Sequence, residues 1–328
     1  MKIVTFINEK GWGNESVPRV GALIDTGAYI LDFARAIRDI SGSLDSKDAA
    51  VPSPPASLLS WFDLDGARLQ RARAVHENII RNEESFDHAC EEGLLVKRSQ
   101  ARLLAPVPRP GKLICIGLNY RDHAAESNMP IPERPVVFSK FTTSVVGPND
   151  SVVLPLTSSQ VDYEAELAVV IGRRAKNVSR DRAFDYVLGY TIVNDVSARD
   201  FQFADGQWQR GKSCDTFAPM GEAIVTTDEV PDPHNLSIKL RLNGQTMQDS
   251  NTDQLIFGVP ELIEFLSESI TLEPGDVIAT GTPPGVGFAR KPPVFIKDGD
   301  VMEVEIEKLG TLTSPVVAAS ETIKAAHP

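Results

Sequence analysis

The sequence is poor in cysteine, and its few cysteines are not arranged for a structural role. It has three in 328 residues, Cys90, Cys115 and Cys214, and no two of them are spaced as CxxC. An odd number of cysteines at such spacings predicts neither a disulfide framework nor a zinc site. Cys115 lies in an apolar run, so we expect it to belong to the core.

Long apolar runs and an excess of basic charge are also missing. Nowhere do eighteen apolar residues follow one another, and the segment from Met1 goes directly into strand-like alternation. This pattern predicts neither a membrane span nor a secretory signal peptide, and we therefore expect a cytoplasmic protein. The net charge of −12, with no cluster of Lys and Arg between aromatic residues, argues against nucleic acid as a partner.

Hydrophobic residues make up 42% of the sequence, which is enough to form the core of one large domain together with a smaller domain. A Pro-rich break at 106–111 predicts a small N-terminal α+β domain over 1–105 and a main domain over 106–328. The main domain alternates short Val/Ile-rich runs with Gly/Pro turns, which is typical of a mostly β fold. We expect short strands at 3–7, 20–24 and 29–32, a loop at 41–55, and helices within 64–84 and at 260–268.

Two carboxylates stand two positions apart in the run from Val161 to Ile171, which reads as a single strand. Glu164 and Glu166 would project from the same side of that strand, and Asp195 ends the next apolar run. A strand buried on both faces keeps two acids together only with compensation, and an oxygen-only ligand set suits Mg²⁺, Mn²⁺ or Ca²⁺. The alternative is a solvated acidic face, as we expect for the strand around 302–307, where acidic and apolar residues alternate.

A second candidate is the histidine of Asn119-Tyr120-Arg121-Asp122-His123-Ala124-Ala125-Glu126. Helical geometry would place His123 and Glu126 on one face, and a carboxylate beside an imidazole fixes its tautomer and raises its basicity. An ordinary ion pair on a helix surface is the alternative.

Two further segments are rich in polar and turn-forming residues. The segment 206–213 reads GQWQRGKS and matches the phosphate-loop pattern formally, but it lacks the buried strand before it and the helix after it that such a loop needs. We reject that match and keep Lys212 as a cation for a substrate carboxylate or an enolate, or else as a surface lysine. The turn at 280–287, TGTPPGVG, offers backbone amides and a threonine hydroxyl to a small anion, unless it is a plain turn.

Taken in order, the motifs NYRDHAAE, DYEAELAVVIG, GYTIVNDVSARDFQ, GQWQRGKSCDTFAPMG and TGTPPGVG resemble the fumarylacetoacetate hydrolase family over residues 112–317. The resemblance implies a mixed β-sandwich roll and a homodimer. It implies a divalent metal, Mg²⁺ or Mn²⁺ with Ca²⁺ as an option, on Glu164, Glu166 and Asp195. It also implies a water-activating dyad of His123 and Glu126 on a lid, and substrate contacts from Lys212, Gln202 and Thr282.

The function that this resemblance implies is hydrolytic C–C cleavage of an acylpyruvate- or fumarylpyruvate-like 1,3-diketo acid through a metal-bound enolate. The same centre in this family also supports oxaloacetate decarboxylation, keto–enol tautomerisation and other isomerisations, and fold and metal ligands do not choose among them. A binding protein that has lost the reaction is a further alternative. In each case the expected partner is a small 2-oxo or diketo acid.

Overall fold

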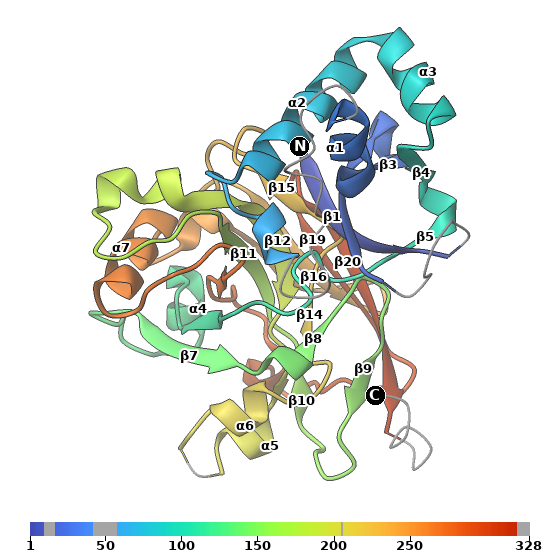
Figure 1. The fold of residues 1–328 in the computed structure, drawn as a ribbon. Coiled ribbons are helices and arrows are strands. Elements are labelled where there is room, and N and C mark those ends of the chain that lie inside the picture. The colour runs from blue at the N-terminus through green and yellow to red at the C-terminus, as the bar shows by residue number, and fades with distance from the viewer. Residues whose placement is uncertain (10–16, 42–57, 205, 320–328) are drawn as a thin grey trace.

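A computed structural model describes residues 1–9, 17–41, 58–204 and 206–319 (Figure 1). The loop expected at 41–55 lies almost wholly outside these ranges. The described residues form two larger sheets with helices around them, so the expected mostly β, α+β fold is confirmed.

The larger sheet has eleven strands in the order β4-β3-β2-β1-β15-β12-β11-β18-β6-β7, with β5 also paired to β1. Its strands are β1 Lys2–Asn8, β2 Arg19–Ile24, β3 Tyr29–Asp32, β4 Leu95–Lys97, β5 Ala101–Leu103, β6 Leu113–Gly117, β7 Val136–Lys140, β11 Ala165–Ile171, β12 Val187–Asn194, β15 Ile224–Thr226 and β18 Val277–Ala279. The three strands expected in the first forty residues are therefore confirmed. Because β1 pairs with β15, the N-terminal strands continue the sheet that holds β11 and β12. The division into domains at residue 105 stays a prediction.

The second sheet has five strands in the order β17-β16-β19-β20-β9. They are β9 Val152–Leu154, β16 Ser237–Leu242, β17 Gln245–Asn251, β19 Val301–Ile306 and β20 Gly310–Ala318. Two short pairs complete the strands, β8 Val145–Val146 with β14 Ala218–Pro219, and β10 Val161–Asp162 with β13 Ser197–Ala198. In β19, Met302, Val304 and Ile306 are buried and the glutamates between them are partly exposed, which confirms the solvated acidic face expected there.

The helices lie around the sheets, with α1 to α3 together at the N-terminal end and α7 on the opposite side (Figure 1). They are α1 Phe33–Ser41, α2 Ala67–Arg81, α3 Glu83–Glu91, α4 Arg121–Glu126, α5 Arg199–Gln202, α6 Gln209–Lys212 and α7 Val259–Ser269. The 3₁₀ turns are η1 Asp25–Gly27, η2 Leu59–Trp61, η3 Arg98–Gln100, η4 Thr142–Ser144, η5 Arg180–Tyr186, η6 Thr252–Gln254 and η7 Gly287–Ala289. Both expected helices are present as α2 and α7, and α7 has proline in its first turn, where the missing N–H costs least. None of the described helices has both the length and the apolar character needed to span a membrane.

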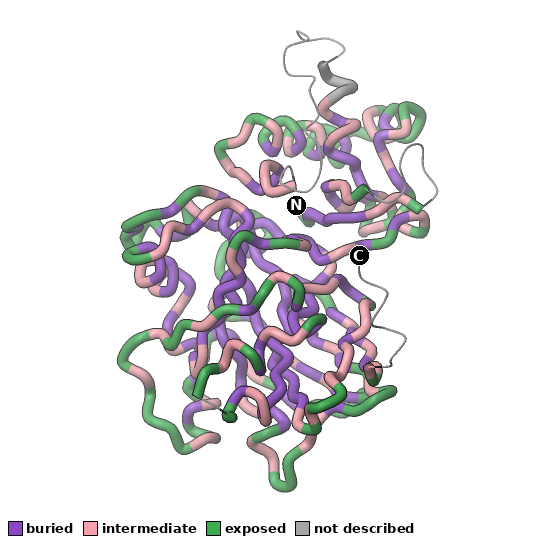
Figure 2. The backbone as a smooth tube through the Cα atoms, turned by 60° about the horizontal axis from the view of Figure 1, so that its bottom comes forward, coloured by how far each residue is buried: buried purple, intermediate pink, exposed green. Residues whose placement is uncertain are grey.

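Strand β11 is the centre of the core, and all seven of its residues are buried. Figure 2 shows the buried backbone running through the middle of the molecule, with exposed residues gathered in the loops. Cys115 is a buried free thiol, as expected. Glu166, the acid within β11, is thus held in a packed, buried strand.

Leu167→Ala should therefore destabilise the fold by about 2–5 kcal/mol, because Leu167 is fully buried in β11 and its truncation leaves a cavity. Urea unfolding followed by circular dichroism measures the loss. The matched control is Leu156→Ala, since Leu156 is 68% exposed and its truncation should change the unfolding free energy by less than about 0.5 kcal/mol. Equal losses in the two variants would contradict a core centred on β11.

Candidate active site

The three carboxylates expected to bind metal meet in one buried cluster. Glu164 precedes β11, Glu166 lies within it, and Asp195 follows β12, which pairs with β11 through Ala165 and Asn194. One oxygen from each acid lies within 4.8 Å of the others, and all three residues are buried. The pairing of two neighbouring strands therefore brings together acids that are thirty residues apart in the sequence.

The run from Val161 to Ile171 is not one strand, and that expectation is wrong. It divides into β10, which pairs with β13, and β11, which pairs with β12, with Tyr163 and Glu164 between them. The division has a tertiary cause, since the carboxylate of Asp162 accepts hydrogen bonds from its neighbour's N–H and from the N–H groups of the distant Gly287 and Phe288. Asp162 therefore binds backbone N–H groups and Arg199 and is not one of the three clustered acids.

The break also fixes the backbone beside the cluster. The N–H of Glu164 donates to Asn194 Oδ1 at 3.0 Å, and the N–H of Asp195 donates to the carbonyl of Glu164 at 2.8 Å. Two of the three acids are thereby locked together through the main chain.

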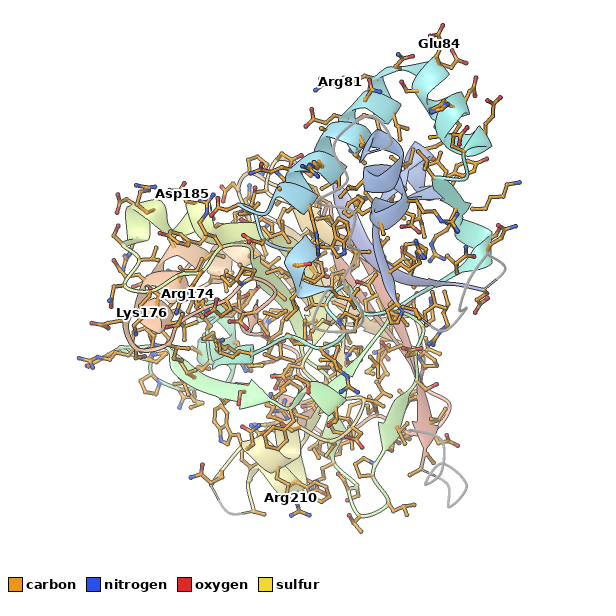
Figure 3. The ribbon with its side chains drawn as sticks, in the orientation of Figure 1. Arg81, Glu84, Arg174, Lys176, Asp185 and Arg210 are labelled. Carbon is orange, nitrogen blue, oxygen red and sulfur yellow. The ribbon has the colours of Figure 1, made fainter. Side chains whose placement is uncertain are left out.

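Three buried cations surround the acids. Lys212 Nζ lies 2.7 Å from Glu164 Oε2 and 2.8 Å from Asp195 Oδ2. Arg199 bridges Glu164 and Asp162 at 2.6 and 2.8 Å, and Lys140 pairs with Asp195 and donates to the carbonyl of Val196. Lys212 was singled out from the sequence as a substrate contact, but the structure places it among the carboxylates. Figure 3 shows its neighbour Arg210 pointing outward from α6.

Sequence reasoning missed Lys140 and Arg199. Lys140 ends the short strand β7, and Arg199 lies in the ARD of a motif that was used for the resemblance but not assigned a role. Neither residue carries a local signal in the sequence, since Lys140 follows Ser139 and Arg199 follows Ser197 and Ala198. Strand pairing places both of them beside the acids. When Asp162 is counted with the three clustered acids, four carboxylates stand against three cations, a formal excess of one negative charge.

The electrostatics differ between the two glutamates. Burial would raise the pKa of Glu164, but Lys212 and Arg199 outweigh it and lower that pKa to about 2. For Glu166, burial and the charges of Asp195 and Glu164 raise the pKa well above its usual range. Within the described residues, no lysine or arginine forms an ion pair with Glu166, whose recorded partner is the N–H of Gly281 at 2.8 Å. Glu166 is therefore the acid that the surrounding cations compensate least.

This arrangement fits a hard divalent cation. Three carboxylate oxygens converge, nitrogen and sulfur ligands are not among them, and one of the acids has no cationic partner. Mg²⁺ and Mn²⁺ prefer such oxygen ligands, and their charge would compensate the acid that is otherwise uncompensated. The donor set therefore agrees with the metal that the sequence predicts, without identifying which ion is used.

The expected dyad is present in α4. His123 Nδ1 lies 3.3 Å from Glu126 Oε2, and their side chains are 15% and 32% exposed. Glu126 also accepts from the N–H of Gly285, with both oxygens at 3.1 Å. A helix of six residues thus presents an imidazole that solvent can reach and whose Nδ1 is fixed by a carboxylate.

The turn at 280–287 contacts both parts of the site. The N–H of Gly281 binds Glu166 of the acidic cluster, while the N–H of Gly285 binds Glu126 of the dyad. Both glycines have positive φ, +104° and +97°, and a Cβ on Gly285 would lie 2.1 Å from the carbonyl oxygen of Met247. This turn therefore needs glycine at both positions and links the acidic cluster to the dyad.

Gln202 and Thr282 are both buried, and each has one polar partner beside the cluster. Gln202 accepts from Arg199 at 3.0 Å, and Thr282 Oγ1 accepts from Gln248 at 2.9 Å. Their roles as substrate ligands stay predictions. The rejected phosphate loop is confirmed as a false match, since the helix α5 precedes it and α6 is a single turn of four residues.

A cleft of about 790 Å³ opens beside β7, and its lining includes Phe138, Lys140 and Trp208 but none of the three clustered acids. Trp208 packs edge-on against Phe138 at 5.4 Å, and Lys212 Nζ lies 5.0 Å from the centre of the Phe138 ring. Lys212 therefore makes a cation–π contact with Phe138 in addition to its ion pairs.

Comparison with known proteins agrees with this geometry. Residues 112–317 match the family model described as fumarylacetoacetate (FAA) hydrolase C-terminal. "Oxaloacetate tautomerase fahd2, mitochondrial" of Xenopus laevis is 44% identical over 302 residues, covering 92% of this chain and 86% of the relative.

Two solved structures resemble this chain along its length. One is fumarylacetoacetate hydrolase from psychrophilic Exiguobacterium antarcticum, with a TM-score of 0.75, 33% identity, and coverage of 97% of this chain and 100% of that one. The other is 2-hydroxyhepta-2,4-diene-1,7-dioate isomerase from Mycobacterium marinum, with a TM-score of 0.70, 33% identity, and coverage of 98% and 100%. The named activities thus include a tautomerase, a hydrolase and an isomerase.

The comparison corrects the expected cytoplasmic location. The Xenopus relative and others from rat and human are named as mitochondrial proteins, which contradicts that expectation. The expectation rested on the lack of a long apolar segment, but mitochondrial targeting segments are amphipathic and rich in arginine, so that lack does not exclude them. On the family model and on the relatives' identity and coverage, the chain belongs to the fumarylacetoacetate hydrolase family.

Proposed function

We propose that the protein catalyses keto–enol tautomerisation of a 2-oxo dicarboxylic acid of the oxaloacetate class at a divalent-metal centre on Glu164, Glu166 and Asp195. The observation that carries the proposal is the buried three-carboxylate cluster, joined by the turn at 280–287 to an accessible His–Glu dyad. The relative named oxaloacetate tautomerase, which aligns with 92% of this chain, favours this reaction over the diketo acid hydrolysis expected from the sequence.

The charge of the cluster suits an acidic substrate. A bound divalent ion would act as a Lewis acid that polarises the substrate's keto oxygen and stabilises an enolate. Four acids and three cations give the cluster a charge of −1, so the loaded site would carry +1 and attract an anion. Lys212 holds Glu164 and Asp195 at hydrogen-bonding distance, and we assign it to positioning these ligands in place of the direct substrate contact first expected.

The dyad supplies the proton transfer. Tautomerisation removes a proton from the carbon next to the ketone and returns one to the oxygen, and the bonds of the carbon skeleton stay intact. With Nδ1 of His123 hydrogen-bonded to Glu126, the other ring nitrogen is the free base. His123 is therefore the group that takes the proton from carbon, and the reverse transfer makes the same residue an acid.

Hydrolysis of an acylpyruvate is the second candidate, supported by one feature of the dyad. His123 and Glu126 are both partly exposed, so a water molecule can reach the imidazole and be activated there. The aligned structure named fumarylacetoacetate hydrolase is consistent with such chemistry on this fold.

A two-substrate assay separates the candidates. Purified protein with Mg²⁺ is given enol-oxaloacetate and, separately, an acylpyruvate, while enol absorbance and product pyruvate are followed together. We expect the enol absorbance of oxaloacetate to fall faster than it does without enzyme, with no release of pyruvate. We expect no cleavage of the acylpyruvate. Rapid release of pyruvate from the acylpyruvate, with oxaloacetate tautomerising no faster than it does without enzyme, would contradict the proposal and favour hydrolysis.

A further inference from the structure

Gln248 occupies an unusual position between the two sheets. It belongs to β17 of the five-stranded sheet, yet its side chain is 1% exposed and bonds to β11 of the larger sheet. A register shift between Leu240 and Arg241 of β16 marks a bulge in β17, and Met247 and Gln248 are buried in succession instead of alternating. Bulges of this kind change the direction of a side chain, and here the amide of Gln248 points from the five-stranded sheet toward β11 of the larger sheet.

The side-chain amide of Gln248 takes the place of a strand partner for the N–H of Ala165. β18 pairs with β11 only along Ala168–Val170, so the N–H of Ala165, which lies between Glu164 and Glu166, is beyond the end of β18. Gln248 Oε1 accepts from this N–H at 2.9 Å. On its other side, Nε2 donates to Thr282 Oγ1 at 2.9 Å and to the carbonyl of Pro283 at 2.7 Å.

These partners fix which way the amide faces. Ala165 offers only a donor and the carbonyl of Pro283 offers only an acceptor, so a flipped amide would place donor against donor and acceptor against acceptor. Thr282 Oγ1 must therefore accept from Gln248, and its hydroxyl hydrogen points elsewhere. Among the described residues, no acceptor for that hydrogen is recorded, although Thr282 is only 6% exposed. A buried hydroxyl donor without a partner is costly unless a ligand accepts from it.

We propose that Gln248 is a positioning residue that holds the Thr282 hydroxyl as a hydrogen-bond donor to the substrate's carboxylate. The proposal rests on the proposed function, because it requires an acid bound beside the metal ligands. Gln248 itself does not touch the substrate, and its effect passes through the one hydroxyl that it orients. With methionine at position 248, that hydroxyl can rotate and donate to the carbonyl of Pro283, and its preference for the ligand is lost.

A double-mutant cycle tests this with oxalate as the probe. The affinity for oxalate at saturating Mn²⁺ is measured by calorimetry for the wild type, Gln248→Met, Thr282→Val and the double variant. A hydrogen bond to a charged group predicts that each single change weakens oxalate binding about 10-fold or more, and that the double variant binds no more weakly than Thr282→Val alone. Gln245→Met, on the exposed part of the same strand, is the matched control and should bind oxalate as the wild type does.

Two further variants keep the test decisive if Gln248→Met does not fold. Thr282→Ser keeps the hydroxyl and should retain the affinity for oxalate. Gln248→Glu places a carboxylate oxygen where it can accept from the Thr282 hydroxyl, so this variant should lose affinity for oxalate. Losses that multiply in the double variant would overturn the role of Gln248 while leaving the metal centre intact. A wild type that takes up neither Mn²⁺ nor oxalate would overturn the proposed function, and this proposal with it.

Discussion

Replacing Glu166 by glutamine should weaken Mn²⁺ binding by at least about 100-fold and remove metal-dependent turnover, because loss of an outer-shell partner alone costs about 10–100-fold. Glu166 is the acid with no cationic partner among the described residues, so it carries the charge that a divalent ion would compensate. The variant should fold normally, since glutamine keeps the oxygen that accepts from Gly281 and removes an uncompensated buried charge. The signal of free Mn²⁺ in electron paramagnetic resonance measures the loss of binding.

The matched control for this substitution lies in β19. Glu303→Gln makes the same chemical change on a partly exposed strand face and should leave Mn²⁺ binding and turnover as in the wild type. If the Glu166 and Glu303 variants bound Mn²⁺ equally well, the cluster would not be the metal site. If Glu166→Gln failed to fold, as judged by circular dichroism, the charge at this position would be needed for structure.

His123→Ala should lower turnover by about 100- to 10,000-fold while leaving Mn²⁺ affinity unchanged, because it removes the proton-transfer group and none of the metal ligands. The dyad and the cluster are linked through the turn at 280–287, where Glu126 and Glu166 bind different N–H groups. The rate of enol decay and the Mn²⁺ affinity, measured on the same preparation, give both quantities.

The comparison variant is His88→Ala, which removes an exposed imidazole from α3 and should change neither quantity. A His123→Ala enzyme with near-normal turnover would show that another group moves the proton. Joint loss of turnover and metal binding would mean that α4 supports the cluster, and the separate role of the dyad would be wrong.

Much of the site was predictable because its signals are local in the sequence. Two glutamates spaced by one residue, an aspartate at the end of an apolar run, and a His–Glu pair at helical spacing each indicate their chemistry within a few residues. The structure brings the three acids within 4.8 Å and the dyad within 3.3 Å, as those patterns require. The homodimer implied by the family stays a prediction.

The features that were missed depend on contacts between distant segments. The break in the strand at Tyr163 follows from hydrogen bonds between Asp162 and residues 125 positions later, which periodicity cannot reveal. Lys140 and Gln248 act on the cluster from strands whose own pattern gives no sign of it, since pairing order and a bulge decide where their side chains go. The expected role of Lys212 changed for the same reason: its partners Glu164 and Asp195 lie beside the ends of β11 and β12, far from α6 in the sequence.

The most direct test of the metal centre is calorimetric titration of Mn²⁺ into metal-free wild-type protein, with and without oxalate. We predict uptake of one ion per chain, tightened by oxalate, because three buried carboxylates provide the ligands and the loaded site favours an anion. Absence of uptake at millimolar Mn²⁺, even with oxalate present, would contradict the metal centre and the reaction proposed for it.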